Sequence, residues 1–133
     1  MPAIAGVSLQ AARARIKYPG RDDLLLVTLD RGTTVAGVFT RSATASAPVQ
    51  WSKKVAASGK ARAILINSGN ANTFTGVQGV ADVRSTAAMA GRAVGCRDSD
   101  VLIASTGVIG EPLPVDRVQR ALAGMESGSR SAS

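Results

Sequence analysis

Apolar residues near the start and middle of the chain fall into short runs that are typical of β-strands. The stretch DLLLVTLD, residues 23–30, and the stretch TTVAGVFT, residues 33–40, are rich in aliphatic and β-branched residues. Arg31 and Gly32 separate them, so the pattern predicts an antiparallel hairpin. ARAILI, residues 61–66, is a near-continuous apolar run and indicates a strand covered on both faces. DVLIAS, residues 100–105, predicts a second short buried strand.

The spacing of apolar residues changes to a helical period over residues 79–95. The periodic positions are Val80, Ala87, Ala88 and Val94. Arg84 and Arg92 fit the outer face of this helix, and Gly95 is a suitable stop.

A last helix is predicted from Pro114, because proline at the first helical position loses no hydrogen bond. Its apolar stripe is Val115, Val118, Leu122 and Met125. The order of elements predicts an α/β (α+β) fold in which helices pack against a mixed sheet. Residues 1–124 form the predicted domain, and residues 125–133 a flexible tail, because ESGSRSAS has no apolar residue larger than alanine.

Charge and composition exclude some functions. The formal charge of +7 raises nucleic acid as a partner, but the cations are scattered and only Tyr18, Phe39, Trp51 and Phe74 could stack on bases. A solvated basic surface, or one that meets an acidic partner chain, fits better. No apolar run has the length of a membrane span, and the start lacks a secretory signal, so we expect a cytoplasmic protein without membrane contact.

The chain has a single cysteine, Cys96, and no histidine. We therefore expect no internal disulfide and no metal site. Cys96 fits a small residue near a helix end better than a reactive thiol. Acyl-transfer chemistry would need a base other than histidine.

Two polar stretches follow the predicted buried strands: NSGNAN, residues 67–72, and STGVIG, residues 105–110. Glycine lets a backbone approach a ligand closely, and successive free amides at such a bend can hold a carboxylate, a phosphate or an oxyanion. Neither stretch matches a phosphate loop, which ends in Gly-Lys-Ser/Thr. The alternative is a pair of tight turns in which Asn and Ser bond local backbone groups.

Several motifs occur in one order along the chain. They are RIKYPGRDDLLLV (15–27), TVAGVFTRS (34–42), SAPVQW (46–51), ARAILINSGNANTFTG (61–76) and VLIASTGVIGEPLP (101–114). Together, over residues 6–124, they resemble the N-terminal part of the α chain in the ornithine acetyltransferase (glutamate N-acetyltransferase) family of arginine biosynthesis. The resemblance implies an incomplete portion of a layered α-β-β-α enzyme.

The resemblance also implies a reaction and a site. Family members transfer an acetyl group from N-acetylornithine to glutamate without a cofactor, and some accept acetyl-CoA as the donor. The precursor cleaves itself before a threonine, which becomes the nucleophile. Thr106 and Gly107 match the pair that forms the oxyanion hole. The NSGNAN signature implies a supporting, substrate-binding role for Asn67, Ser68, Gly69, Asn70 and Asn72.

The nucleophile segment of the family has no counterpart in this chain. The only Ala-Thr pair, Ala43 and Thr44, has the wrong neighbours, and two further family segments that contact substrate are absent. We therefore expect an inactive chain whose partners are the remainder of the α chain and the β chain, in a hetero-oligomer. Two alternatives stay open: a stand-alone binding protein for an N-acetylated amino acid, and a basic nucleic-acid-binding module.

Overall fold

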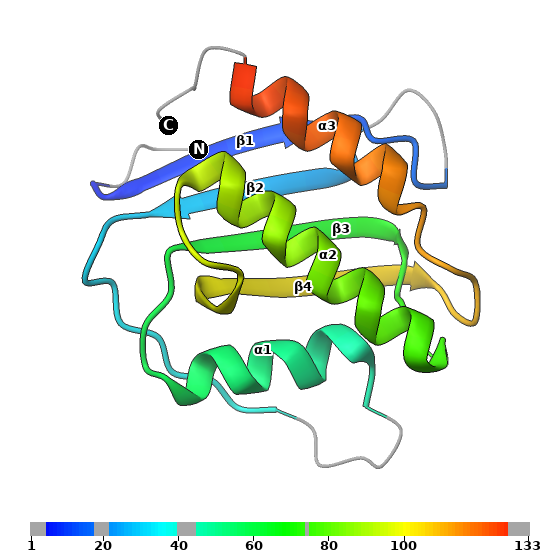
Figure 1. The fold of residues 1–133 in the computed structure, drawn as a ribbon, viewed down its shortest axis with the longest axis horizontal. Coiled ribbons are helices and arrows are strands. Elements are labelled where there is room, and N and C mark those ends of the chain that lie inside the picture. The colour runs from blue at the N-terminus through cyan, green and yellow to red at the C-terminus, as the bar shows by residue number, and fades with distance from the viewer. Residues whose placement is uncertain (1–4, 18–21, 40–44, 74, 128–133) are drawn as a thin grey trace.

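The computed structural model describes residues 5–17, 22–39, 45–73 and 75–127 (Figure 1). Its strands are β1 (Val7–Ala12), β2 (Leu24–Leu29), β3 (Ala63–Asn70) and β4 (Val101–Val108). Its α-helices are α1 (Ala47–Ala57), α2 (Gly76–Val94) and α3 (Val115–Ser127), and a short 3-10 turn, Asp98–Asp100, leads into β4.

The four strands form one mixed sheet in the order β1-β2-β3-β4. β2 pairs antiparallel with β1 and β3, whereas β3 and β4 are parallel and are connected through α2. Helices α2 and α3 lie on one face of the sheet, and α1 lies along the outer edge of β4 (Figure 1). The predicted fold class, a mixed sheet with helices packed against it, is confirmed.

The predicted hairpin of residues 23–30 and 33–40 is wrong. Both edges of β2 are taken by β1 and β3, so no edge remains for residues 33–39. The chain turns out of the sheet after β2, where the Thr33 amide donates to the carbonyl of Asp30 at 3.2 Å. Residues 33–39 then form only an isolated bridge between Thr34 and Lys60. Residue 40 lies outside the described residues.

The hydrophobic core lies between the sheet and helices α2 and α3. Alternate side chains of the strands point into it, since successive strand residues face opposite sides. Its most buried members include Leu24, Leu26, Ala63, Leu65, Val101 and Ile103 from the strands and Val83, Ala87, Val118 and Leu122 from the helices. These residues make one cluster, so the sheet and both helices depend on each other for burial.

On the opposite side of the sheet, here called the open face, none of the described helices is packed (Figure 1). Leu25, Val27, Ile64 and Leu102 are half-buried there, and Ile66 is 37% exposed. The described residues therefore cover residues 61–66 on one face only, and coverage of both faces stays a prediction for the complete protein. Along β3, Ala63 and Leu65 are buried under the described helices, whereas Ile64 and Ile66 are more exposed on the open face.

Helix α2 contains the predicted helical segment, starts earlier, at Gly76, and stops before Gly95 as predicted. Val80 was assigned to its apolar stripe, but this residue is 53% exposed. In α3 the predicted stripe is confirmed, with Val118 and Leu122 almost fully buried. The helix continues to Ser127, so the domain boundary predicted at residue 124 falls inside it. Residues 128–133 of the predicted tail lie outside the described residues.

Two elements were not predicted from the sequence, β1 and α1. Helix α1 begins at Ser46, whose side-chain oxygen accepts a hydrogen bond from the Val49 amide, and Pro48 lies in its first turn. A serine cap followed by an early proline is a typical helix start. The apolar spacing behind it is weak, which explains why the pattern alone missed this helix.

Candidate functional site

The polar stretch after each predicted strand is itself part of a strand. β3 includes Asn67 to Asn70, and β4 includes Ser105 to Val108. The two segments pair in parallel, with Ser68 opposite Thr106 and Gly69 opposite Gly107. The predicted bend at residues 105–110 is therefore wrong for its first four residues, because pairing with β3 extends the strand.

Glycine is required where the two strands approach most closely. Gly69 and Gly107 are register partners, and their φ angles are +102° and +128°, which L side chains rarely adopt. A Cβ on Gly107 would meet the Gly69 carbonyl carbon, the Asn70 nitrogen at 2.6 Å and the Gly69 Cα at 2.7 Å. These atoms belong to the backbone and cannot rotate away. The pair therefore fixes the strand ends close together.

The three asparagines of NSGNAN are buried and hydrogen-bonded inside the chain. The side-chain amide of Asn67 donates to the backbone carbonyl of Asn70 at 2.8 Å, and the side-chain oxygen of Asn67 accepts from the Ser105 hydroxyl. The side-chain amide of Asn70 donates to the backbone carbonyls of Glu111 and Pro112 at 3.0 and 3.2 Å. The side-chain oxygen of Asn70 accepts from the backbone amide of Asn72. Asn67 and Asn70 thus tie β3 to β4 and to the loop that follows β4.

Asn72 extends this network to helix α2. Its side-chain amide donates to the Gly79 carbonyl at 3.0 Å, and its oxygen accepts from the Thr75 hydroxyl at 2.6 Å. Its φ of +52° is held by these bonds at a residue that is only 1% exposed. Since buried polar groups need partners, the three asparagines are positioning residues in this structure.

The hydroxyls of Ser68 and Thr106 differ from the asparagines. Each follows a residue that points toward α2 and α3, so each points to the open face. Thr106 is exposed and Ser68 is half-buried. Among the described residues, neither hydroxyl has a hydrogen-bond partner. These two register partners are the polar side chains of the two stretches that remain available to a ligand.

The edge of β4 that faces away from β3 ends near Gly107. The outer edge of β4 is identified by Ser52 of α1, whose hydroxyl accepts from the Ile103 amide at 2.9 Å and donates to the Ile103 carbonyl at 2.6 Å. Trp51 likewise donates to the Val101 carbonyl at 2.9 Å. Because strand residues alternate between the two edges, the backbone of Thr106 faces β3, and regular alternation would turn the next amide, that of Gly107, outward. Gly107 is exposed.

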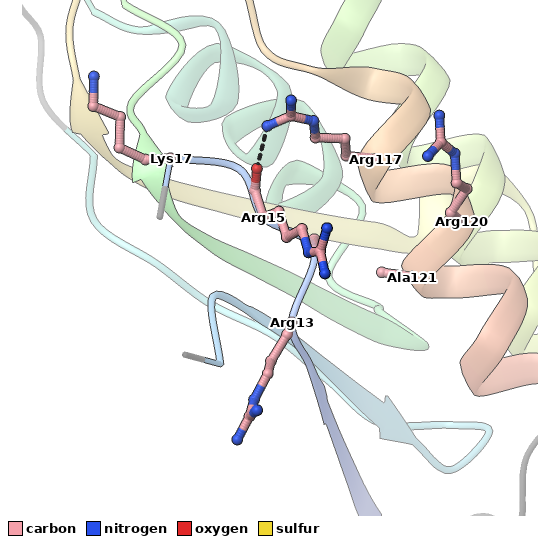
Figure 2. A pocket seen from close by; sticks show the side chains of 7 residues that line it. Arg13, Arg15, Lys17, Arg117, Arg120 and Ala121 are labelled. Atoms are coloured by element: carbon pink, nitrogen blue, oxygen red, sulfur yellow. Dashed lines mark hydrogen bonds between the residues drawn. The ribbon is translucent and has the colours of Figure 1, made fainter. Parts of the chain in front are cut away.

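A cationic cavity borders this site. It has a volume of about 580 Å³ and lies between residues 13–17 and helix α3 (Figure 2). Lys17 lines the cavity, and a Cβ on Gly69 would lie 3.0 Å from the Cβ of Lys17, so the cavity and the strand ends are neighbours. Buried Asp23 shapes the loop, because its carboxylate accepts from the amides of Ala14 and Ile16 at 2.6 and 2.8 Å.

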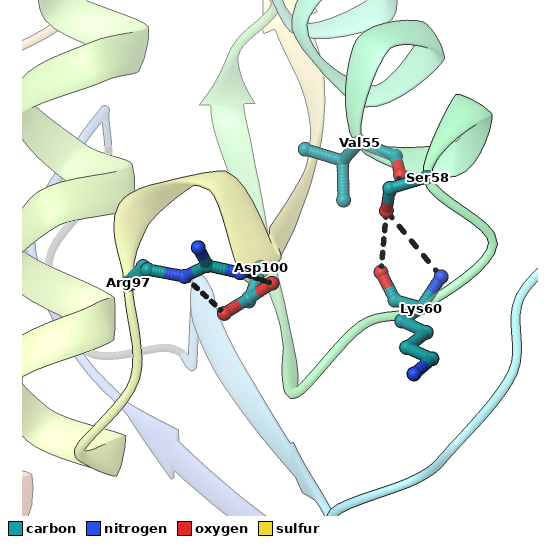
Figure 3. Close-up of polar contacts among 5 residues, drawn as sticks. All are labelled: Val55, Ser58, Lys60, Arg97 and Asp100. Carbon is teal, nitrogen blue, oxygen red and sulfur yellow. Dashed lines mark hydrogen bonds and ion pairs between the residues drawn. The ribbon is translucent and has the colours of Figure 1, made fainter.

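A second cavity, of about 390 Å³, lies at the start of β4, about 20 Å along the strand from Thr106. Two side chains fix the turns beside it (Figure 3). The Ser58 hydroxyl donates to the carbonyl of Val55 at 2.7 Å and accepts from the Lys60 backbone amide at 3.4 Å, and Arg97 pairs with Asp100 at 3.2 Å. This second cavity is lined by both acidic and basic residues, and it lies beside the turns that lead into β3 and β4.

Titratable groups offer little other chemistry in the described part of the chain. No cluster of three or more His, Cys, Asp or Glu residues suited to a metal ion occurs there. Burial raises the pKa of the Cys96 thiol, and the nearby Arg62 guanidinium opposes this effect. No described helix is both long enough and apolar enough to cross a bilayer.

Comparisons with known proteins agree with this architecture. The ArgJ family model matches residues 8–132. The arginine biosynthesis bifunctional protein ArgJ of Bradyrhizobium diazoefficiens is 56% identical over 113 residues, which cover 85% of this chain and 27% of that protein. The ArgJ protein of Brucella suis is 50% identical over 125 residues, or 94% of this chain and 30% of that protein.

Two solved structures have the same fold. Ornithine acetyltransferase of Mycobacterium tuberculosis, solved with ornithine, superposes with a TM-score of 0.90 at 35% identity, covering 97% of this chain and 69% of that one. The ArgJ protein of Bacillus halodurans gives 0.85 at 29% identity, covering 97% of this chain and 66% of that one.

The mixed four-stranded sheet with helices packed on one face is therefore the fold of solved ArgJ and ornithine acetyltransferase structures. The chain belongs to the ArgJ family, the family of the ornithine acetyltransferases. It spans about 27–32% of the length of the curated relatives that it matches most extensively.

Proposed function

We propose that this chain supplies the oxyanion-stabilising part of an ornithine acetyltransferase, which moves an acetyl group from N-acetylornithine to glutamate. The threonine nucleophile comes from residues outside this chain, so the chain alone is inactive. The observation that carries the proposal is the placement of Thr106 and Gly107 in an exposed segment of β4, clamped against Ser68 and Gly69 of β3.

Thr106 and Gly107 stabilise the oxyanion through different groups. The Thr106 amide faces β3, so this residue acts through its hydroxyl on the open face. Gly107 acts through its backbone amide, which strand alternation would turn outward in the plane of the sheet. Two donors on adjacent residues, both at the outer rim of β4, suit one oxygen atom. The asparagine network holds these donors in place before substrate arrives.

The reaction follows from this placement. The external threonine hydroxyl attacks the acetyl carbon of N-acetylornithine, and the carbonyl π electrons move to the oxygen that Thr106 and Gly107 bind. Collapse of the tetrahedral intermediate breaks the C–N bond, and the ornithine nitrogen takes the proton that the hydroxyl lost. The amine of glutamate then attacks the acetyl ester in the same way and regenerates the threonine. Acetyl-CoA would be a second acetyl donor at the same site.

The open face supports a larger assembly. Leu25, Val27, Ile64 and Ile66 leave an apolar surface that water contacts unfavourably. We propose that the remainder of the same enzyme covers this face and brings the nucleophile to the rim of β4. The complete enzyme is then a hetero-oligomer of this chain and its partner chains.

A chimera tests the role of Thr106. In the Bradyrhizobium relative, this chain replaces the matching segment, and acetyl transfer from N-acetylornithine to glutamate is measured. Thr106→Val removes the hydroxyl at nearly constant shape and should lower kcat about 10²–10³-fold with little change in KM, as expected for one lost oxyanion donor. Thr106→Ser should keep most of the activity.

The control is Thr34→Val, an exposed threonine outside the sheet. The proposal for Thr106 is wrong if Thr106→Val retains kcat within a few-fold of the unmodified chimera. Calorimetry of this chain with N-acetylornithine provides a second measurement. Tight binding by the chain alone would instead favour a stand-alone binding protein.

A further inference from the structure

The cationic cavity beside α3 gathers charges that are far apart in the sequence. Arg13, Arg15 and Lys17 come from the segment after β1, and Arg117 and Arg120 come from the first turns of α3. In Figure 2, Arg117 reaches from the helix to the segment, where its guanidinium donates to the Arg15 carbonyl. The five cations line one cavity, and none of the described residues that line it is acidic.

Nearby carboxylates neutralise only part of this charge. Arg13 pairs with Asp22 at 3.6 Å, Lys17 with Glu111 at 4.0 Å and Arg120 with Asp116 at 3.2 Å, and all three acidic side chains are exposed. Within the described residues, the guanidinium groups of Arg15 and Arg117 have no carboxylate partner. The centre of the cavity therefore carries uncompensated positive charge.

The loop that presents these cations is held in shape. Arg15 has a φ of +58°, a conformation that is uncommon for residues other than glycine. It persists because the amides on either side, Ala14 and Ile16, donate to the buried Asp23 carboxylate. Arg117 fixes the carbonyl of the same residue. The backbone that presents these cations is thus held in place by the rest of the chain.

We infer that this cavity binds a small molecule that carries two or more linked phosphate groups. A volume of about 580 Å³ fits a nucleotide-sized ligand. Guanidinium groups bind phosphate oxygens in pairs, and two unpaired arginines beside three further cations match several phosphate charges. An extended nucleic acid fits less well, because the carboxylates of Asp22, Glu111 and Asp116 surround the cavity and repel a long polyanion. The cavity borders the proposed acetyl-transfer site, but this inference does not rest on that proposal.

Calorimetric titration of the full chain with inorganic pyrophosphate tests the inference. The unmodified chain should bind pyrophosphate, more weakly as salt is raised, and ATP should compete. Arg15→Gln and Arg120→Gln should each weaken binding at least tenfold. Arg120 is an exposed helix residue, so its variant keeps the fold even if Arg15→Gln does not, and circular dichroism checks both.

Arg92→Gln, an exposed arginine of α2 outside the cavity, is the matched control and should change the affinity less than twofold. The inference fails if millimolar pyrophosphate does not bind, or if Arg92→Gln weakens binding as much as Arg120→Gln. It also fails if single-stranded DNA binds and pyrophosphate does not displace it. Acetyl transfer by the chimera does not depend on any of these outcomes.

Discussion

Replacing Gly107 by alanine should destabilise the chain strongly. Alanine at a φ of +128° costs about 1–3 kcal/mol in backbone strain. The added Cβ would also lie 2.6 Å from the Asn70 nitrogen and 2.7 Å from the Gly69 Cα, and such overpacking costs about 1–3 kcal/mol more. The expected loss of unfolding free energy is about 2–6 kcal/mol, a large part of the roughly 5–15 kcal/mol of a typical domain.

Urea unfolding measures this loss, and Gly32→Ala is the matched control. Gly32 has a φ of +85°, but an added Cβ there would have no atom within 4 Å. Gly32→Ala should therefore cost only the backbone part, about 1–2 kcal/mol. If Gly107→Ala lowers the unfolding free energy no more than Gly32→Ala does, the close approach of the β3 and β4 backbones is not as described.

Three other results are expected. Ser52→Ala removes two buried hydrogen bonds and should lower the unfolding free energy by about 1–3 kcal/mol in the same urea assay, while Ser85→Ala on the exposed side of α2 should change it little. Because burial raises the pKa of Cys96, the contribution of this thiol to the unfolding free energy should be complete below its ordinary pKa of 9.0 and decline at higher pH. Iodoacetamide should therefore alkylate the folded chain more slowly than the urea-unfolded chain near pH 9. Equal rates would contradict this expectation. The open face should make the isolated chain associate, and Val27→Thr with Ile66→Thr should reduce this in sedimentation velocity; a sharp monomer before substitution would refute it.

Long periodic segments were predictable from the sequence. Helices α2 and α3 repeat their apolar residues over several turns, and each repeat adds evidence for the same face. The partners of β2 were not predicted, because β1 was not recognised as a strand and residues 33–40 were taken for one. The hairpin rule paired β2 with that false strand and therefore failed here.

The candidate site was located in the sequence, but its geometry was not. Asn and Gly normally indicate turns, yet parallel pairing keeps NSGN and STGV in strands, since tertiary context overrides local preference. The roles of the asparagines depend on distant partners, such as the Glu111 carbonyl 41 positions after Asn70. The cations of the cavity seemed scattered for the same reason, since Arg15 and Arg117 are 102 positions apart.

Helix α1 also bears on protection against strand addition. An edge strand exposes a row of unpaired amides and carbonyls that another chain can extend into a larger sheet. Ser52 and Trp51 occupy the outward groups of Val101 and Ile103, so an incoming strand would find only the last few residues of β4. That remnant is too short to template a neighbouring strand. Helix α1 therefore leaves the end of this strand edge exposed but prevents another strand from pairing along the rest of it.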